Sequence, residues 1–80
     1  MDDGNILKLI EKLSAEEQGL EESHHGQALT KVQMDRMKAM EIELDQCYDL
    51  LRQRRARRSA GLDPNQATVR SEGVVENYLQ

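Results

Sequence analysis

The chain has 80 residues, of which 38% are hydrophobic and 32% are charged, and its formal net charge is −4. A chain this short forms one domain at most and buries only about 60–65% of the surface that its unfolded form exposes. No apolar run approaches the ~20 residues of a membrane span, and the acidic N-terminus lacks the basic region of a signal peptide. A single cysteine excludes a disulfide framework. We therefore expect a soluble, cytoplasmic, all-helical protein with a small core and no contact with a membrane.

The first predicted helix covers about residues 4–24. Asp2 or Asp3 precedes it and can accept hydrogen bonds from the first free N–H groups of the helix. Five residues then follow one another at spacings of four and three, which is the pattern of one helical stripe. The stripe consists of Ile6, Ile10, Leu13, Glu17 and Leu20.

The second predicted helix covers about residues 30–60, after a break at Gly26. Thr30 and Gln33 match a capping box, in which each side chain bonds the backbone N–H of the other residue. Gly61 marks the C-terminal end, because glycine tolerates the left-handed conformation that commonly follows a helix. The stripe of this helix consists of Met37, Met40, Leu44, Cys47 and Leu51.

The remaining residues, 62–80, form a C-terminal turn and a short docking segment in this interpretation. Asp63-Pro64 predicts a turn or a short helical turn, and Ser71 can begin a last helix over residues 72–79. The fold class is thus all-α, with an antiparallel, coiled-coil-like hairpin over residues 1–61 and a partly ordered C-terminal segment.

The two stripes fit together if the helices run antiparallel. Every pair across the seam then shares one midpoint, between Ala28 and Leu29, which is next to the loop that the capping pattern predicts independently. The same register places Arg54 and Arg55 opposite Asp3 and Asp2 at the open end of the hairpin. The predicted pairs are Ile6–Leu51, Ile10–Cys47, Leu13–Leu44, Glu17–Met40 and Leu20–Met37.

Several apolar residues fall outside this seam and need cover from the C-terminal segment or from a second copy of the chain. We expect a homodimer that forms a four-helix arrangement, and a monomer with its tail folded back is the alternative. The candidate self-association residues are Leu7, Val32, Ile42 and Leu50.

Residues 52–58 are the only basic segment, with five arginines and no acid, whereas residues 1–29 carry seven acids and two lysines. The arginines can form salt bridges within the chain or a dimer, bind an acidic protein partner, or bind nucleic acid phosphates. The negative net charge opposes approach to nucleic acid. The candidate partner-binding residues are Arg52, Arg54, Arg55, Arg57 and Arg58.

No pattern in the sequence indicates catalysis. Glu21 with His24, and Glu22 with His25, have the spacing of carboxylate-bridged metal sites, but their place at a helix end favours solvated loop residues. Cys47 lies on the seam and is interpreted as a core residue, with the neighbouring Asp45 and Asp49 raising its pKa. We predict no enzyme activity, no cofactor and no metal site. The methionine group on the second helix, which is also interpreted as core, is Met34, Met37 and Met40.

The run from Glu43 to Ala56, ELDQCYDLLRQRRA, resembles a family of short uncharacterised proteins, mainly actinobacterial. Asp63-Pro64, Val69-Arg70 and the ending VENYLQ are similar to that family too, and Tyr48 stands where its pattern has tryptophan. The resemblance implies a helical fold and a cytoplasmic setting, and it transfers no activity. Two hypotheses follow: a self-associating protein-interaction module, or a small nucleic-acid-associated regulator that binds through residues 52–58.

Overall fold

A computed structural model describes residues 2–23 and 26–79, and for residues 76–79 it describes the backbone. The elements are α1 (Asp3–Ser23), α2 (Lys31–Ser59), a 3₁₀ helix η1 (Pro64–Gln66) and α3 (Glu72–Leu79). The described residues contain no strand. The prediction of an all-helical chain with two long helices and a short C-terminal segment is therefore confirmed.

The ends of the helices follow from local chemistry. The Asp2 carboxylate accepts a hydrogen bond from the Asn5 N–H at 2.8 Å and so begins α1. Thr30 and Gln33 form the predicted capping box at the start of α2. At the end of α2 the N–H of Leu62 donates to the carbonyl of Arg57 at 2.8 Å, around Gly61 with a φ of 74°. This is a Schellman motif, which requires the left-handed residue that glycine supplies.

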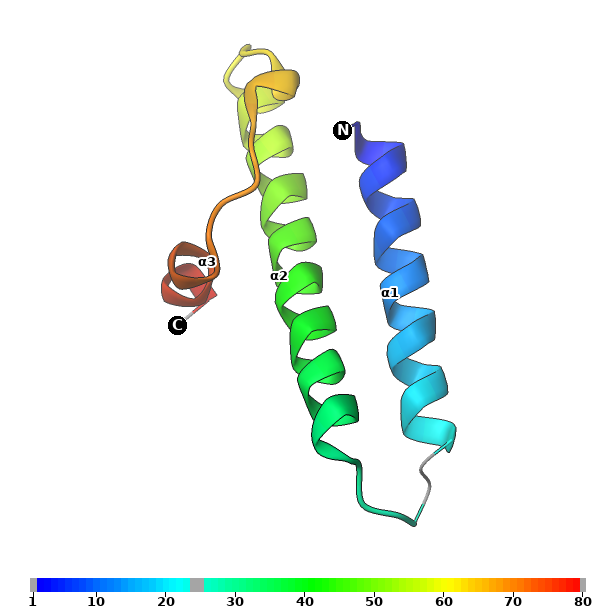
Figure 1. Cartoon of the computed structure of the whole chain (residues 1–80). Coiled ribbons are helices and arrows are strands. Elements are labelled where there is room, and N and C mark those ends of the chain that lie inside the picture. Colours follow the sequence, from blue (N-terminus) through cyan, green and yellow to red (C-terminus); the bar gives the residue numbers. More distant parts are fainter. Residues whose placement is uncertain (1, 24–25, 80) are drawn as a thin grey trace.

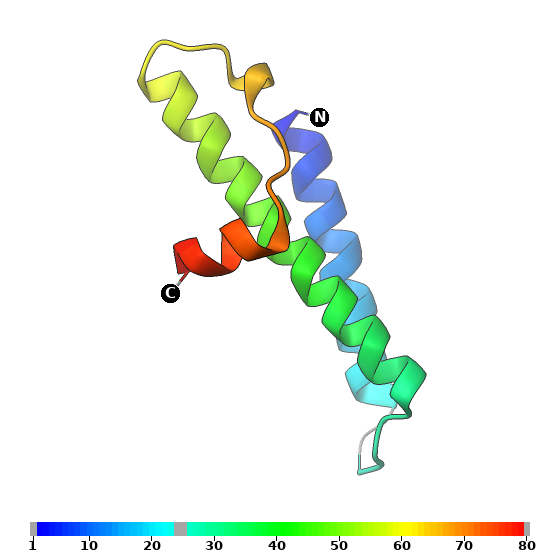
Figure 2. The same cartoon turned by 60° about the vertical axis from the view of Figure 1, so that its left-hand side comes forward.

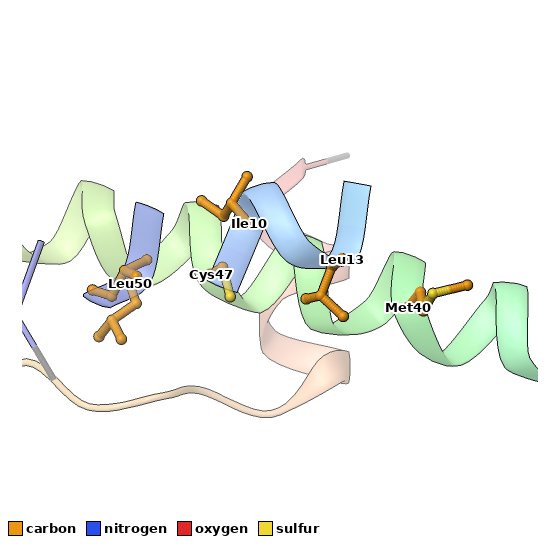
Figure 3. Close-up of a cluster of buried hydrophobic side chains, with 6 residues drawn as sticks. Ile10, Leu13, Met40, Cys47 and Leu50 are labelled. Carbon is orange, nitrogen blue, oxygen red and sulfur yellow. The ribbon is translucent and has the colours of Figure 1, made fainter. Parts of the chain in front are cut away.

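The helices α1 and α2 lie side by side and antiparallel, joined by the loop that includes Gly26 (Figure 1). The core between them contains every apolar residue of the two predicted stripes. Figure 3 shows side chains of both helices, among them Ile10, Leu13 and Cys47, gathered along this seam. The predicted antiparallel register is thus consistent with the core, although Glu17 adds a carboxylate to it and is only half-buried.

The chain beyond α2 returns along one side of the hairpin. We call residues 62–71, which include η1, the C-terminal arm. Figure 2 shows the arm passing along α2 and α3 crossing that helix at a steep angle. Both η1 and α3 contact α2. Asp63 begins η1 by accepting a hydrogen bond from the Asn65 N–H.

Leu50 and Ile42 are both covered, wholly or in part, within the chain. Leu50 is 5% exposed and belongs to the core, against which Ala67 of the arm packs. Ile42 is half-buried and lines a small hollow together with Val75 of α3. The chain buries the Leu50 side chain itself, and the part that these residues take in self-association stays a prediction. Leu7 and Val32 are exposed by 53% and 77%.

Candidate functional site

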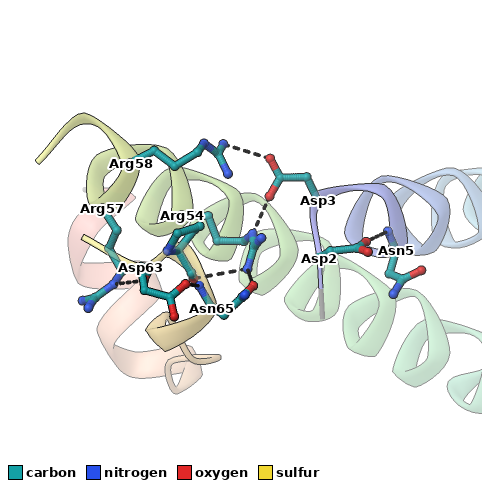
Figure 4. A network of polar contacts seen from close by, with 9 residues as sticks. Asp2, Asp3, Asn5, Arg54, Arg57, Arg58, Asp63 and Asn65 are labelled. Atoms are coloured by element: carbon teal, nitrogen blue, oxygen red, sulfur yellow. Dashed lines mark hydrogen bonds and ion pairs between the residues drawn. The ribbon is translucent and has the colours of Figure 1, made fainter. Parts of the chain in front are cut away.

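The arginine segment lies at the open end of the hairpin, where α1 begins and α2 ends. Arg54 is only 6% exposed, and its guanidinium donates to the Asp3 carboxylate, to the Pro64 carbonyl and to the Asn65 side chain. Figure 4 shows Arg54 between Asp3 and the arm, with Arg58 reaching the other oxygen of the same carboxylate. Arg54 is therefore a structural residue that joins α1, α2 and η1.

Two other arginines of the segment are also engaged inside the chain. Arg58 donates to the other oxygen of Asp3 at 2.9 Å, and Arg57 donates to the Asp63 carbonyl at 2.7 Å. Hydrogen bonds from Arg54 and Arg58 hold the pKa of the Asp3 carboxyl below its ordinary value. Most of the positive charge is thus directed at the chain itself.

Arg52 and Arg55 complete the segment. Arg52 is half-buried, and Arg55 is exposed with no ion pair or hydrogen bond to any residue that the structure describes. The predicted pairing of Arg54 with Asp3 is confirmed, but that of Arg55 with Asp2 is wrong. Asp2 caps α1 instead, because its carboxylate reaches the Asn5 N–H.

A second polar cluster, which the sequence analysis missed, anchors the C-terminal arm. Asp49 on α2 is fully buried and pairs with Arg70 through both carboxylate oxygens. Hydrogen bonds from Arg70 lower the pKa of Asp49. Gln53 donates to Asp49 at 3.0 Å and to the Thr68 carbonyl at 2.8 Å, and Gln46 donates to the Arg70 carbonyl at 3.2 Å.

This cluster explains how the short C-terminal arm is kept in contact with α2. A buried carboxylate is tolerated only when it is paired and hydrogen-bonded, so Asp49 requires Arg70 close by. The only signal in the sequence is the lone Arg70 in an otherwise uncharged stretch, residues 64–71, together with the run of acids without a base in the middle of α2, residues 41–49. Nothing in the local pattern relates Arg70 to Asp49 rather than to Asp45.

The chemistry available around Cys47 is limited. The thiol is 7% exposed, and burial, with a smaller contribution from Glu43, raises its pKa. The direction agrees with our prediction, but the charged neighbour is Glu43 rather than Asp45 or Asp49. Beside it lies a groove of about 100 Å³, which is below the 300–1,000 Å³ that small-molecule sites usually have. The groove is lined by Leu9, Glu43, Gln46, Cys47, Leu50 and Val69.

Two further findings concern metals and membranes. Among the side chains that the structure describes, those of residues 2–23 and 26–75, no three histidine, cysteine or acidic groups are placed together as a metal ion would need. His24 and His25, and with them the two Glu-x-x-His spacings, lie outside the described residues. None of the helices in the described part of the chain is both long enough and apolar enough to cross a membrane.

The side of the hairpin opposite the arm carries apolar residues that the described chain covers only in part. On α2, Tyr48 is 46% exposed, and Leu44 and Leu51 beside it are only partly buried against the core. On α1, Leu7 lies toward the same side by helical periodicity. We call Leu7, Leu44, Tyr48 and Leu51 the uncovered face. Val74, at 47% exposure, lies on α3 and thus away from this face.

The fold and these surfaces define a small helical hairpin protein with a tethered C-terminal arm. The chain belongs to a family described as proteins of unknown function (DUF2630), whose model matches residues 2–80. This confirms the resemblance to a family of short uncharacterised proteins. Uncharacterized proteins of Mycobacterium bovis (Mb0922c) and Mycobacterium tuberculosis (Rv0898c) are each 46% identical over 77 residues, which is 95% of this chain and 88% of theirs. No solved structure matches the chain.

Proposed function

We propose that this protein is a small protein-interaction module whose helical hairpin self-associates as a homodimer in a four-helix arrangement. The observation that carries the proposal is the uncovered face. The arm and α3 cover one side of the hairpin, whereas Leu7 and Tyr48 are about half exposed on the other. Two helices alone form a thin core, and pairing with a second hairpin is the usual way in which such a chain buries more apolar surface.

The arginine segment supports this function better than it supports nucleic acid binding. A nucleic acid site needs several arginines directed outward at phosphates. Arg54 is buried, and Arg57 and Arg58 donate to groups of the same chain. Within the arginine segment, only Arg55 is exposed and lacks a partner among the described residues.

We also propose binding rather than catalysis, because the described residues offer no nucleophile with an adjacent base. Cys47 is buried and its thiol has a raised pKa, which is the reverse of what an activated cysteine requires.

The test is the molecular mass of the full chain in solution, measured by sedimentation equilibrium over micromolar concentrations. We expect a mass that increases with concentration toward that of two chains. A mass that stays at one chain throughout this range would contradict the proposal. Retention on duplex DNA or RNA that weakens as salt is raised from ~50 mM would instead favour the nucleic acid hypothesis.

A further inference from the structure

This inference rests on the proposed self-association. The geometry points to a specific occupant of the uncovered face: the α2 helix of a second copy, antiparallel to the first, about a two-fold axis that crosses the uncovered face at the level of residue 46. In this arrangement Leu44 of each copy lies opposite Tyr48 of the other, and Arg55 lies opposite Met37. The spacing of the residues on this face, the distribution of charge along it and its position on the hairpin support this pairing independently.

The spacing along α2 is the first argument. The α2 residues of the uncovered face belong to a longer stripe of six residues along the same side of the helix. The intervals between successive residues of this stripe are four, three, four, three and four, and this series is the same from either end of the helix. Two copies of such a stripe can pair antiparallel with every pair sharing one midpoint, as a two-fold interface requires. The stripe is Met37, Glu41, Leu44, Tyr48, Leu51 and Arg55.

The charge distribution is the second argument. Toward the open end of the hairpin the stripe ends in Arg55, with Arg52 beside it, whereas toward the loop it carries Glu41. Neither Arg55 nor Glu41 pairs with any residue in the part of the chain that the structure describes. Antiparallel pairing brings Arg52 and Arg55 of one copy within about a turn of Glu41 of the other, whereas parallel pairing would place like charges together.

The position of the stripe is the third argument. From Met37 to Arg55 it extends about 27 Å at the 1.5 Å rise of a helix, which is roughly the middle half of a molecule 50 Å long. Leu7 of α1 flanks it, so that part of α1 enters the same interface. The arm passes along α2 (Figure 2), and the α2 residues that hydrogen-bond it, Gln46, Asp49 and Gln53, do not belong to the stripe.

The first experiment compares two variants of similarly exposed residues. Tyr48→Glu places a charge at the centre of the interface, and we expect the dimer to weaken about 30-fold or more. Val74→Glu is the matched control, because Val74 is as exposed as Tyr48 but lies on α3. We expect its dimer to match that of the unaltered chain, and circular dichroism checks that both variants remain helical. A dimer that responds to Val74→Glu and not to Tyr48→Glu would overturn this arrangement.

The second experiment reverses the charges. Arg55→Glu and Glu41→Arg should each weaken the dimer about 10-fold, because each places like charges together twice in a two-fold pair. The double variant should regain most of the loss. If the losses of dimer affinity in the two single variants simply added in the double variant, the antiparallel arrangement would be overturned.

The third experiment reads the register directly by disulfide formation. Met37→Cys and Arg55→Cys are made separately in a Cys47→Ala chain and then mixed under mild oxidation. We expect the mixed disulfide to form faster than either like-with-like disulfide, because antiparallel pairing separates two Arg55 positions by about 27 Å. Like-with-like disulfides in excess would indicate a parallel pair. A wild-type chain that is always monomeric contradicts the proposed function itself, whereas a dimer indifferent to these variants contradicts only the arrangement described here.

Discussion

At the scale of the residue, Asp49 is the side chain on which the arm depends most. It is fully buried, and the Arg70 guanidinium and the Gln53 amide supply its hydrogen bonds. Because it lies on α2 and Arg70 lies 21 residues further along the chain, this one ion pair closes the connection between the hairpin and the segment before α3. Removing Arg70 would leave a buried carboxylate with only an amide to compensate its charge.

The ion pair predicts a dependence of stability on pH. Hydrogen bonds from Arg70 lower the pKa of Asp49 below its ordinary value, so the stabilisation is complete above that ordinary pKa and is lost as the pH falls through the lower, folded pKa. Asp49→Asn should reduce the free energy of unfolding by about 1–3 kcal/mol at neutral pH, with a smaller loss of stability on acidification. Urea unfolding from pH 7 to about pH 3 measures both effects.

The control for this prediction is Asp35→Asn. Asp35 pairs with Lys31 on the surface of α2, where both side chains are mostly exposed, so its removal should change stability by less than about 0.5 kcal/mol. If Asp49→Asn left the acid slope of unfolding equal to that of the unaltered chain, the pair with Arg70 would not be the source of the pH dependence.

At the scale of the element, two glycines should respond to alanine with opposite signs. Gly61 has a φ of 74°, and nothing lies within 4 Å of an added Cβ, so only backbone strain opposes Gly61→Ala. We expect a loss of about 1 kcal/mol. Gly19 lies inside α1 with open space around it, and Gly19→Ala should stabilise by roughly 0.5–1 kcal/mol. Thermal unfolding of the two variants measures the signs, and a stabilising Gly61→Ala would contradict the capping argument.

The helices could be predicted because their signals are local. The capping box at Thr30, the glycine after α2 and the stripes of α1 and α2 each depend on residues within a few turns of one another. The packing of the C-terminal arm over the core, which contains Leu50, could not be predicted. It depends on Ala67 and on polar contacts between segments that are far apart in the sequence. For the same reason the sequence indicated Leu50 as a self-association residue.

In the candidate site, too, the contacts between the two long helices could be predicted, whereas the contacts with the arm could not. The pairing of Arg54 with Asp3 followed from the register of the two helices, which the seam determines. The partners of Arg57 and the additional partners of Arg54 lie in η1 and just before it, and their positions depend on how the chain turns after Gly61. An arginine-rich segment therefore looked more available for an external partner than the folded chain leaves it.

At the scale of the whole molecule, the chain is elongated, with extents of 50 × 25 × 16 Å and a radius of gyration of 15.0 Å. A compact domain of this length would have a radius of gyration of about 12 Å. The difference arises because the hairpin is long and only two helices thick. Such a shape exposes a large surface relative to its core, and association is a general way to reduce it.

This shape leads to a prediction about thermal unfolding. If two hairpins fold and pair together, the dimer is favoured by mass action, and the midpoint of thermal unfolding should rise with protein concentration. Calorimetry or circular dichroism from about 1 to about 100 µM, a range that spans typical dissociation constants of such pairs, measures the change. Tyr48→Glu should have a lower midpoint that no longer varies with concentration, whereas Val74→Glu should retain the rise. A midpoint of the unaltered chain that is the same at both ends of the range would mean that the hairpin and its arm are stable as a single chain.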